Sequence, residues 1–186
     1  MILDEIPSGL GRSGKMFVCE HYDIVPDILV IGKGLGGGVF PLAAMLARDE
    51  FDVAADQALG HYTHEKSPVA CAAGLATLEI IEEEDLLTKT SELGRYMKER
   101  LVGLQARYPI IHEVRGIGLI IGVVLRQPDG ARAEDAAEQM LYECLSRGLS
   151  FKITMGSILT LTPPLTISRV ELDDALMILD NCFANL

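Results

Sequence analysis

The chain has 186 residues, a formal net charge of −11 at pH 7, and 49% hydrophobic residues. The apolar content suffices for a packed core, and the acidic balance argues against binding to nucleic acid or to an anionic membrane surface. No apolar run reaches the length needed to cross a bilayer, and no signal peptide is expected at the start. The four cysteines lack disulfide-framework or zinc spacing, which fits a reducing cytoplasm.

The first residues predict the end of a buried strand. Side chains alternate between the two faces of a strand, so Asp4 and Ile6 share one face and Glu5 points away. The loop over residues 7–14, rich in glycine, follows. This places Asp4 at the carboxyl end of the first strand.

A second strand is predicted over residues 28–31, whose four apolar side chains indicate burial on both faces. Lys33 and a run of glycines follow it. Ligands of open α/β sheets bind beyond the carboxyl ends of strands, so we expect Asp4 and Lys33 to face one site. From the residues alone, an ordinary Asp–Lys ion pair beside a flexible turn stays open. A Walker loop is excluded because the lysine precedes the glycines.

Four elements of the sequence occur in a specific order. They are Asp4-Glu5-Ile6, Gly9-Leu10-Gly11-Arg12-Ser13-Gly14-Lys15, Pro26-Asp27-Ile28 and Gly32-Lys33-Gly34-Leu35-Gly36-Gly37-Gly38. Together they resemble the signature of the class III aminotransferases, fold-type I enzymes that depend on pyridoxal phosphate. The resemblance implies an α/β chain with part of the large-domain sheet and a small α+β C-terminal domain. It also implies that the chain corresponds to the carboxyl-terminal part of a longer enzyme.

The resemblance assigns roles to four residues. Lys33 would form the Schiff base with pyridoxal phosphate and then shuttle a proton. Asp4 would keep the pyridine nitrogen protonated, and Ile6 would pack against the ring. Thr63 falls where relatives bind the cofactor phosphate of the neighbouring subunit. A homodimer with its active site at the subunit interface is therefore expected.

The segment around Thr63 also contains two histidines, His61 and His64, followed by Glu65. Their spacing differs from the His-Glu-x-x-His arrangement of helical zinc sites, and Gly60 and Pro68 favour a loop. We therefore expect no metal site.

The remaining sequence predicts helices and strands in turn. Helices are expected over 68–84, 86–108 and 133–146, and a last helix is expected after the capping-box pair Ser168 and Glu171. Strands are expected over 40–47, 119–125, 149–153 and 158–161. We expect residues 1–108 to complete the large domain with its linking helix, and residues 109–186 to form the small domain.

Two positions depart from the family pattern. Thr160 stands where many relatives carry an arginine that binds the substrate carboxylate, and Pro7 stands where a glutamine is common. The main functional prediction is transfer of an amino group from an amine or amino acid to a 2-oxo acid. One alternative is a lyase that acts on an amino alcohol bearing phosphate or phosphonate. Another is an incomplete, non-catalytic fragment that serves only subunit association.

Overall fold

The computed structural model describes residues 1–54, 56–57, 60 and 62–186. Contacts divide the chain into two compact units, Met1–Leu87 and Thr88–Leu186. The sequence places a domain boundary after residue 108, and that boundary stays a prediction. Within the described residues, no helix combines the length and the apolar character needed to span a membrane.

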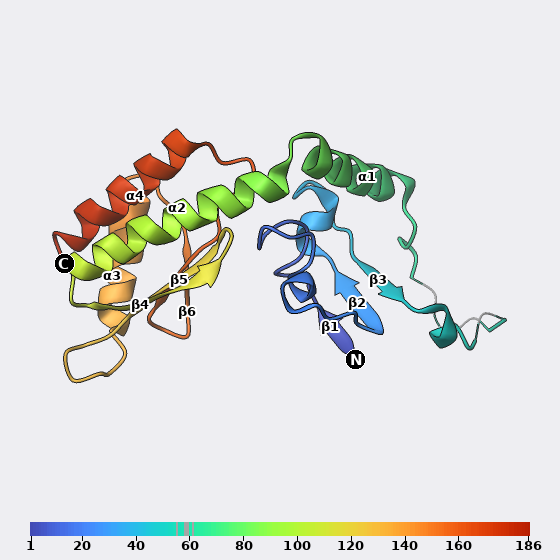
Figure 1. The fold of residues 1–186 in the computed structure, drawn as a ribbon, viewed down its shortest axis with the longest axis horizontal. Helices are drawn as coiled ribbons and strands as arrows, with labels where there is room; N and C mark the ends of the chain where they lie inside the picture. The colour runs from blue at the N-terminus through green and yellow to red at the C-terminus, as the bar shows by residue number, and fades with distance from the viewer. Residues whose placement is uncertain (55, 58–59, 61) are drawn as a thin grey trace. The chain divides into compact units, whose positions relative to one another are not determined.

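The N-terminal unit contains a three-stranded mixed sheet. Its strands are β1 (Ile2–Asp4), β2 (Ile28–Ile31) and β3 (Ala44–Ala47), in the order β1-β2-β3 (Figure 1). β1 runs parallel to β2, with Asp4 opposite Val30, and β3 runs antiparallel to β2. The parallel pair brings the carboxyl ends of β1 and β2 to the same edge of the sheet.

Short helical turns and one long helix complete this unit. They are η1 (Val18–Tyr22), η2 (Lys33–Gly36), η3 (Asp49–Phe51) and α1 (Pro68–Glu83). A Cβ on Gly74 of α1 would lie 2.7 Å from Cδ2 of Leu42 and 3.5 Å from the carbonyl oxygen of Leu35. The small residue thus lets α1 pack closely against the segment that follows Lys33.

Burial in this sheet differs from the sequence prediction. Leu29 and Ile31 are buried, but Ile28 and Val30 are only half-buried, so β2 is covered fully on one face. The strand predicted over 40–47 forms only at Ala44–Ala47, and all four of its residues are exposed. The apolar composition of β3 indicates a surface that packs against another element or another protein, and no described part of the chain covers it.

The C-terminal unit is an antiparallel sheet with three helices. The strands are β4 (Ile111–Ile117), β5 (Ile120–Leu125), β6 (Lys152–Thr154) and β7 (Ile158–Leu161), in the order β4-β5-β7-β6. The helices are α2 (Leu86–Arg107), α3 (Glu134–Ser146) and α4 (Arg169–Phe183) (Figure 1). Strands and helices share one apolar core, which includes fully buried Leu101, Ile121, Leu125, Met140, Leu159 and Leu172. Among the described residues, most of the buried apolar side chains lie in this unit.

Candidate functional site

The predicted acid and amine lie at neighbouring strand ends. Asp4 is the last residue of β1, and Lys33 follows β2 after one glycine, Gly32. Both side chains belong to exposed residues. The parallel pairing of β1 and β2 therefore places a carboxylate and an amine at the same edge of the sheet, as predicted from the order of the strands.

Lys33 has an unusual backbone conformation. Its φ of 48° lies in the left-handed region, which is uncommon for a residue other than glycine. Such a residue costs on the order of 1–3 kcal/mol and persists only where the surrounding structure holds it. Here Lys33 opens the short helix η2, and Leu35 N donates to Gly32 O at 3.1 Å. The tight turn fixes the backbone from which the amine projects.

Ile6 lies beside Asp4 and close to Gly32, the residue before Lys33. Its backbone N–H donates to Asp4 Oδ1 at 2.9 Å, which fixes the orientation of the carboxylate. A Cβ built on Gly32 would lie 3.7 Å from both Cγ1 and Cγ2 of Ile6. Ile6 thus contacts the chain immediately before Lys33, and three of the four predicted residues gather at this edge.

Sequence reasoning assigned no role to Glu5, which anchors the strand end. Glu5 is 4% exposed, and its carboxylate accepts hydrogen bonds from Cys19 N at 2.9 Å and Ser8 Oγ at 2.6 Å. Its own backbone N–H donates to Val30 O at 2.9 Å. Glu5 therefore ties Asp4 to β2, to the loop and to η1. The alternation that turns Glu5 away from Asp4 was the available signal for its burial.

Thr63 is the fourth predicted site residue. It is exposed in a turn, and no described contact joins it to Asp4, Ile6 or Lys33. Its predicted role concerns a neighbouring subunit and stays a prediction. His61 lies outside the described residues, and among the residues described no group of three or more His, Cys, Asp or Glu side chains could hold a metal ion.

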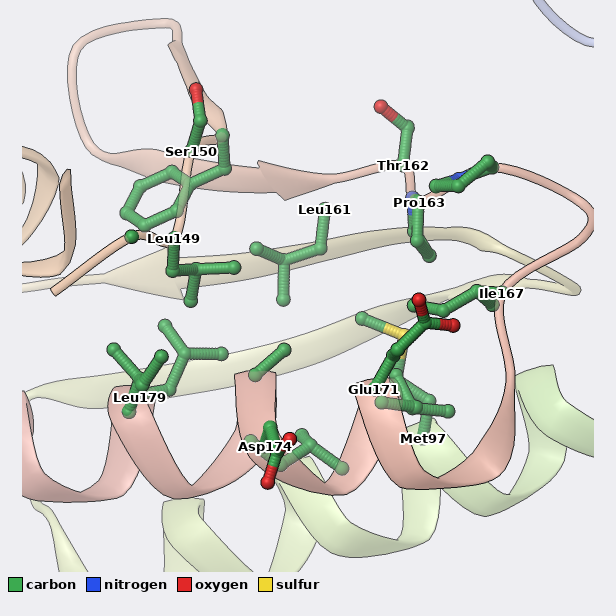
Figure 2. Close-up of a pocket in the computed structure, with 17 residues that line it drawn as sticks. Met97, Leu149, Ser150, Leu161, Thr162, Pro163, Ile167, Glu171, Asp174 and Leu179 are labelled. Atoms are coloured by element: carbon green, nitrogen blue, oxygen red, sulfur yellow. The ribbon is translucent and has the colours of Figure 1, made fainter.

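A cavity of the C-terminal unit lies outside the predicted site. It has a volume of about 410 Å³ and is lined mainly by apolar side chains of α4 and of the segments 148–151 and 161–164. Figure 2 shows Leu161 and Pro163 on one side of this cavity and Leu179 of α4 on the other. None of the four predicted site residues lines it. Glu171 and Asp174 also line it, but its lining includes no lysine, arginine or histidine, so it offers no amine and no base paired with an acid.

Thr160 lies on β7 in the same unit. Its Oγ1 is 2.8 Å from Oγ1 of Thr154 on the adjacent strand, so the two hydroxyls form a hydrogen bond. This position therefore presents a neutral hydroxyl pair, which cannot clamp a carboxylate in the bidentate manner of arginine.

Comparison with known proteins covers nearly the whole chain. The model of the family "Aminotransferase class-III" matches residues 1–183. The chain is 50% identical over 188 residues to (R)-1-hydroxy-2-aminoethylphosphonate ammonia-lyase of Vibrio splendidus, a match that spans 100% of the chain and 39% of that protein. It is 43% identical over 176 residues to ornithine aminotransferase of Halalkalibacterium halodurans, spanning 94% of the chain and 42% of that protein.

A solved structure supports the same relationship. A phospholyase from Arthrobacter in complex with phosphoethanolamine superimposes with a TM-score of 0.94 at 29% identity, over 100% of this chain and 45% of that one. The chain thus spans less than half the length of these relatives and matches part of their fold-type I architecture. With its signature residues in order and its family match over 1–183, the chain belongs to the class III aminotransferase family of pyridoxal-phosphate-dependent enzymes.

Proposed function

We propose that this chain belongs to a pyridoxal-phosphate-dependent lyase that releases ammonia from a small amino alcohol bearing phosphonate or phosphate. The main prediction from the sequence was an aminotransferase, and the comparisons favour its alternative. The observation that carries the proposal is the 50% identity to an ammonia-lyase that acts on an aminophosphonate, against 43% for the ornithine aminotransferase.

Thr160 supports the proposal independently. An enzyme that takes an amino acid benefits from a guanidinium that binds the α-carboxylate through two parallel hydrogen bonds. Thr160 offers only a hydroxyl already paired with Thr154. A substrate without an α-carboxylate needs no arginine at this position.

The residues at the edge of the N-terminal sheet fit the cofactor that the family uses. Lys33 offers an exposed primary amine for the cofactor aldehyde, and Asp4 offers an exposed carboxylate for a protonated ring nitrogen. Ile6 adds an apolar side chain beside Gly32. When bound, pyridoxal phosphate supplies an electron-withdrawing ring that stabilises negative charge on the substrate carbon.

The side chains of this site would carry out the proton transfers of the reaction. The Nζ atom of Lys33 would take a proton from the substrate carbon and return one later in the reaction. The carboxylate of Asp4, oriented by Ile6 N, would hold the proton on the ring nitrogen. Thr63 is proposed to bind the phosphate group of the cofactor that a neighbouring subunit holds, which makes the active enzyme at least a homodimer.

Two other functions give different outcomes in the same experiment. An aminotransferase, suggested by the 43% identity to ornithine aminotransferase, would need a 2-oxo acid to complete its cycle. A non-catalytic chain that serves only association would bind no cofactor. Both predictions can be tested on the protein that carries this chain.

The first test measures ammonia release. The protein is incubated with pyridoxal phosphate and (R)-1-hydroxy-2-aminoethylphosphonate in the absence of any 2-oxo acid, and ammonia is quantified enzymatically. We expect multiple turnovers of ammonia per subunit. Conversion of the cofactor to its pyridoxamine form without ammonia release, with turnover only when a 2-oxo acid accepts the amino group, would instead identify an aminotransferase.

The second test concerns Lys33 directly. After borohydride reduction of the protein with pyridoxal phosphate, mass spectrometry should find the pyridoxyl group on the peptide that contains Lys33. The variant Lys33→Ala should lose the modification and all turnover, whereas Lys89→Ala, an exposed lysine of α2, should retain both. A chain labelled equally at many lysines, or not at all, contradicts the assigned role of Lys33.

A further inference from the structure

Three arginines converge on a small cavity of the C-terminal unit. Arg115 comes from β4, Arg126 directly follows β5, and Arg132 lies shortly before α3. With His112 and Ser157 they line a cavity of about 160 Å³. We call it the arginine cavity. No predicted site residue lines it, so a ligand in this cavity is independent of the proposed function.

The backbone forces two of these arginines together. Arg126 and Arg132 face each other across an antiparallel bridge. The turn that connects them is closed by hydrogen bonds from Gln127 N to Ala131 O and from Gly130 N to Gln127 O, each 2.9 Å long. Like charges directly opposite each other on paired strands destabilise the pairing. An anion bound between them would remove this repulsion.

Neighbouring carboxylates do not satisfy the three guanidinium groups. Glu113 Oε2 is 3.6 Å from Arg115 Nη1, and Glu134 Oε1 is 3.9 Å from Arg132 Nη1, so both ion pairs are longer than a hydrogen bond. Within the described part of the chain, no carboxylate forms an ion pair with Arg126. Each guanidinium carries five N–H donors. The cavity therefore keeps donors available to a ligand.

A hydrogen bond to the backbone orients the side chain of Arg126. Its Nη1 donates to Gly130 O at 2.7 Å, which holds the guanidinium along the turn. The side chains of Arg115 and Arg132 are 55% and 57% exposed, so a solute can reach them. Ser157, which is 4% exposed, adds a hydroxyl to the lining. The lining carries three arginines against the carboxylate of Glu113, and Glu134 adds a second carboxylate beside Arg132, in a protein whose formal net charge is −11.

We propose that the arginine cavity binds a small doubly charged oxyanion, namely a phosphate or phosphonate group. The planar guanidinium fork matches the oxygens of such a group, and a doubly charged ligand offsets the repulsion among three guanidinium groups that Glu113 and Glu134 approach only at 3.6 Å and 3.9 Å. A singly charged carboxylate would leave part of the repulsion between Arg126 and Arg132 in place. The cavity volume of about 160 Å³ suits a single phosphate-sized group.

The experiment is a calorimetric titration of the full chain with inorganic phosphate and with methylphosphonate at pH 7.5, and with acetate for comparison. We expect saturable binding of the two dianions at one site, and much weaker binding of acetate. Arg132→Gln and Arg126→Gln should each weaken phosphate binding by at least about tenfold, since a hydrogen bond between charged groups is lost. Arg147→Gln, which changes the charge equally but pairs with Glu143 on α3 outside the cavity, should leave the affinity unchanged.

A second measurement does not depend on the variants. Arg126→Gln also removes the bond to Gly130 O, and the turn could rearrange. NMR of the side-chain Nε–H groups in the unmodified chain should therefore show phosphate-induced shifts concentrated on Arg115, Arg126 and Arg132. Shifts spread over all arginines, or an affinity that both cavity variants leave unchanged, would overturn the proposal.

Discussion

Single side chains fix how α2 and α4 meet in the C-terminal unit. Asp180 of α4 accepts hydrogen bonds from Tyr108 Oη at 2.7 Å and from Arg107 Nη2 at 2.8 Å. Burial raises the pKa of Asp180, but these two hydrogen bonds and the charge of Arg107 outweigh it and hold the pKa below its usual value. The ring of Tyr108 also stacks on that of Phe183, with centroids 5.6 Å apart. One carboxylate thus links the end of α2 to α4.

Removing the phenolic hydroxyl should weaken this link in a pH-dependent way. Tyr108→Phe should lower the free energy of unfolding at pH 7 by about 0.5–1.5 kcal/mol. A carboxyl whose pKa is lowered by folding stabilises the protein above its unfolded pKa of about 3.9, and this stabilisation is lost as the pH falls through the folded pKa. In urea unfolding, the difference between variant and parent should therefore shrink below about pH 4.

The control for this prediction is another tyrosine. Tyr142→Phe on α3 removes the hydroxyl of a residue that is 61% exposed, and stability should stay within about 0.5 kcal/mol of the parent. A loss in Tyr108→Phe that is equally large at pH 7 and pH 3 would show that the ionised Asp180 is not the partner that matters.

At the scale of elements, two glycines let α2 approach the β4–β5 turn. A Cβ on Gly94 would lie 2.3 Å from the carbonyl oxygen of Gly118 and 2.6 Å from its Cα. Gly118 has a φ of 54°, so the turn itself requires the left-handed conformation. The helix therefore rests directly on the backbone of the turn, which cannot yield as a flexible side chain would.

Two alanine substitutions on α2 should have opposite effects. Gly94→Ala should destabilise the protein by about 1–3 kcal/mol, because the added methyl group forces α2 away from the turn. Gly103→Ala meets no atom within 4 Å and should stabilise the helix by roughly 0.5–1 kcal/mol. Thermal or urea unfolding of both variants tests the contact, which would be refuted if Gly94→Ala were also stabilising.

Local signals were the part of the fold that the sequence predicted best. Pro68 marks the beginning of α1, and the Ser168–Glu171 pair forms the expected capping box, with Ser168 N donating to Glu171 Oε2 at 2.8 Å. β4 was not recognised, because a register shift between Ile111 and Glu113 breaks the alternation that identifies a strand. A helix start or a capping box depends on a few adjacent residues and can be predicted from them. A bulge depends on how the strand pairs with its partner strand, which lies elsewhere in the sequence.

The candidate site likewise has a part that can be predicted from local sequence and a part that cannot. The positions of Asp4 and Lys33 followed from two strands and their order, which the sequence displays. The anchoring of Glu5 by Cys19 N could not be predicted, because it joins residues 14 positions apart through an irregular loop. The exposure of β3 could not be predicted either, because it depends on which element packs against the strand, and the composition of the strand does not specify that element.

For the whole molecule, burial is distributed unevenly between the two units. The C-terminal unit holds the continuous apolar core, which includes fully buried Leu101, Leu119, Ile121 and Leu159. In the N-terminal unit, Leu29 and Ile31 are the buried residues of the sheet, and β3 is exposed throughout. Regions with few buried apolar contacts open at lower free energy.

Hydrogen exchange should report this difference. In the 186-residue chain, we expect amides of β1, β2 and β3 to exchange faster than those of β5 and β7, because opening the three-stranded sheet exposes less apolar surface. The measurement is exchange at neutral pH followed by mass spectrometry of peptic peptides. Equal protection in both sheets would show that the N-terminal unit is stabilised by interactions other than its own core.

The order β1-β2-β3 has a practical consequence for handling the protein. Within the described residues, the outer sides of β1 and β3 pair with no further strand, so their backbone amides and carbonyls stay available to another chain. Met45 and Leu46 add apolar side chains, 66% and 49% exposed, along one of these margins. At high concentration, molecules of this chain should therefore adhere through intermolecular strand pairing, and a charged residue in place of Met45 should delay the onset of turbidity.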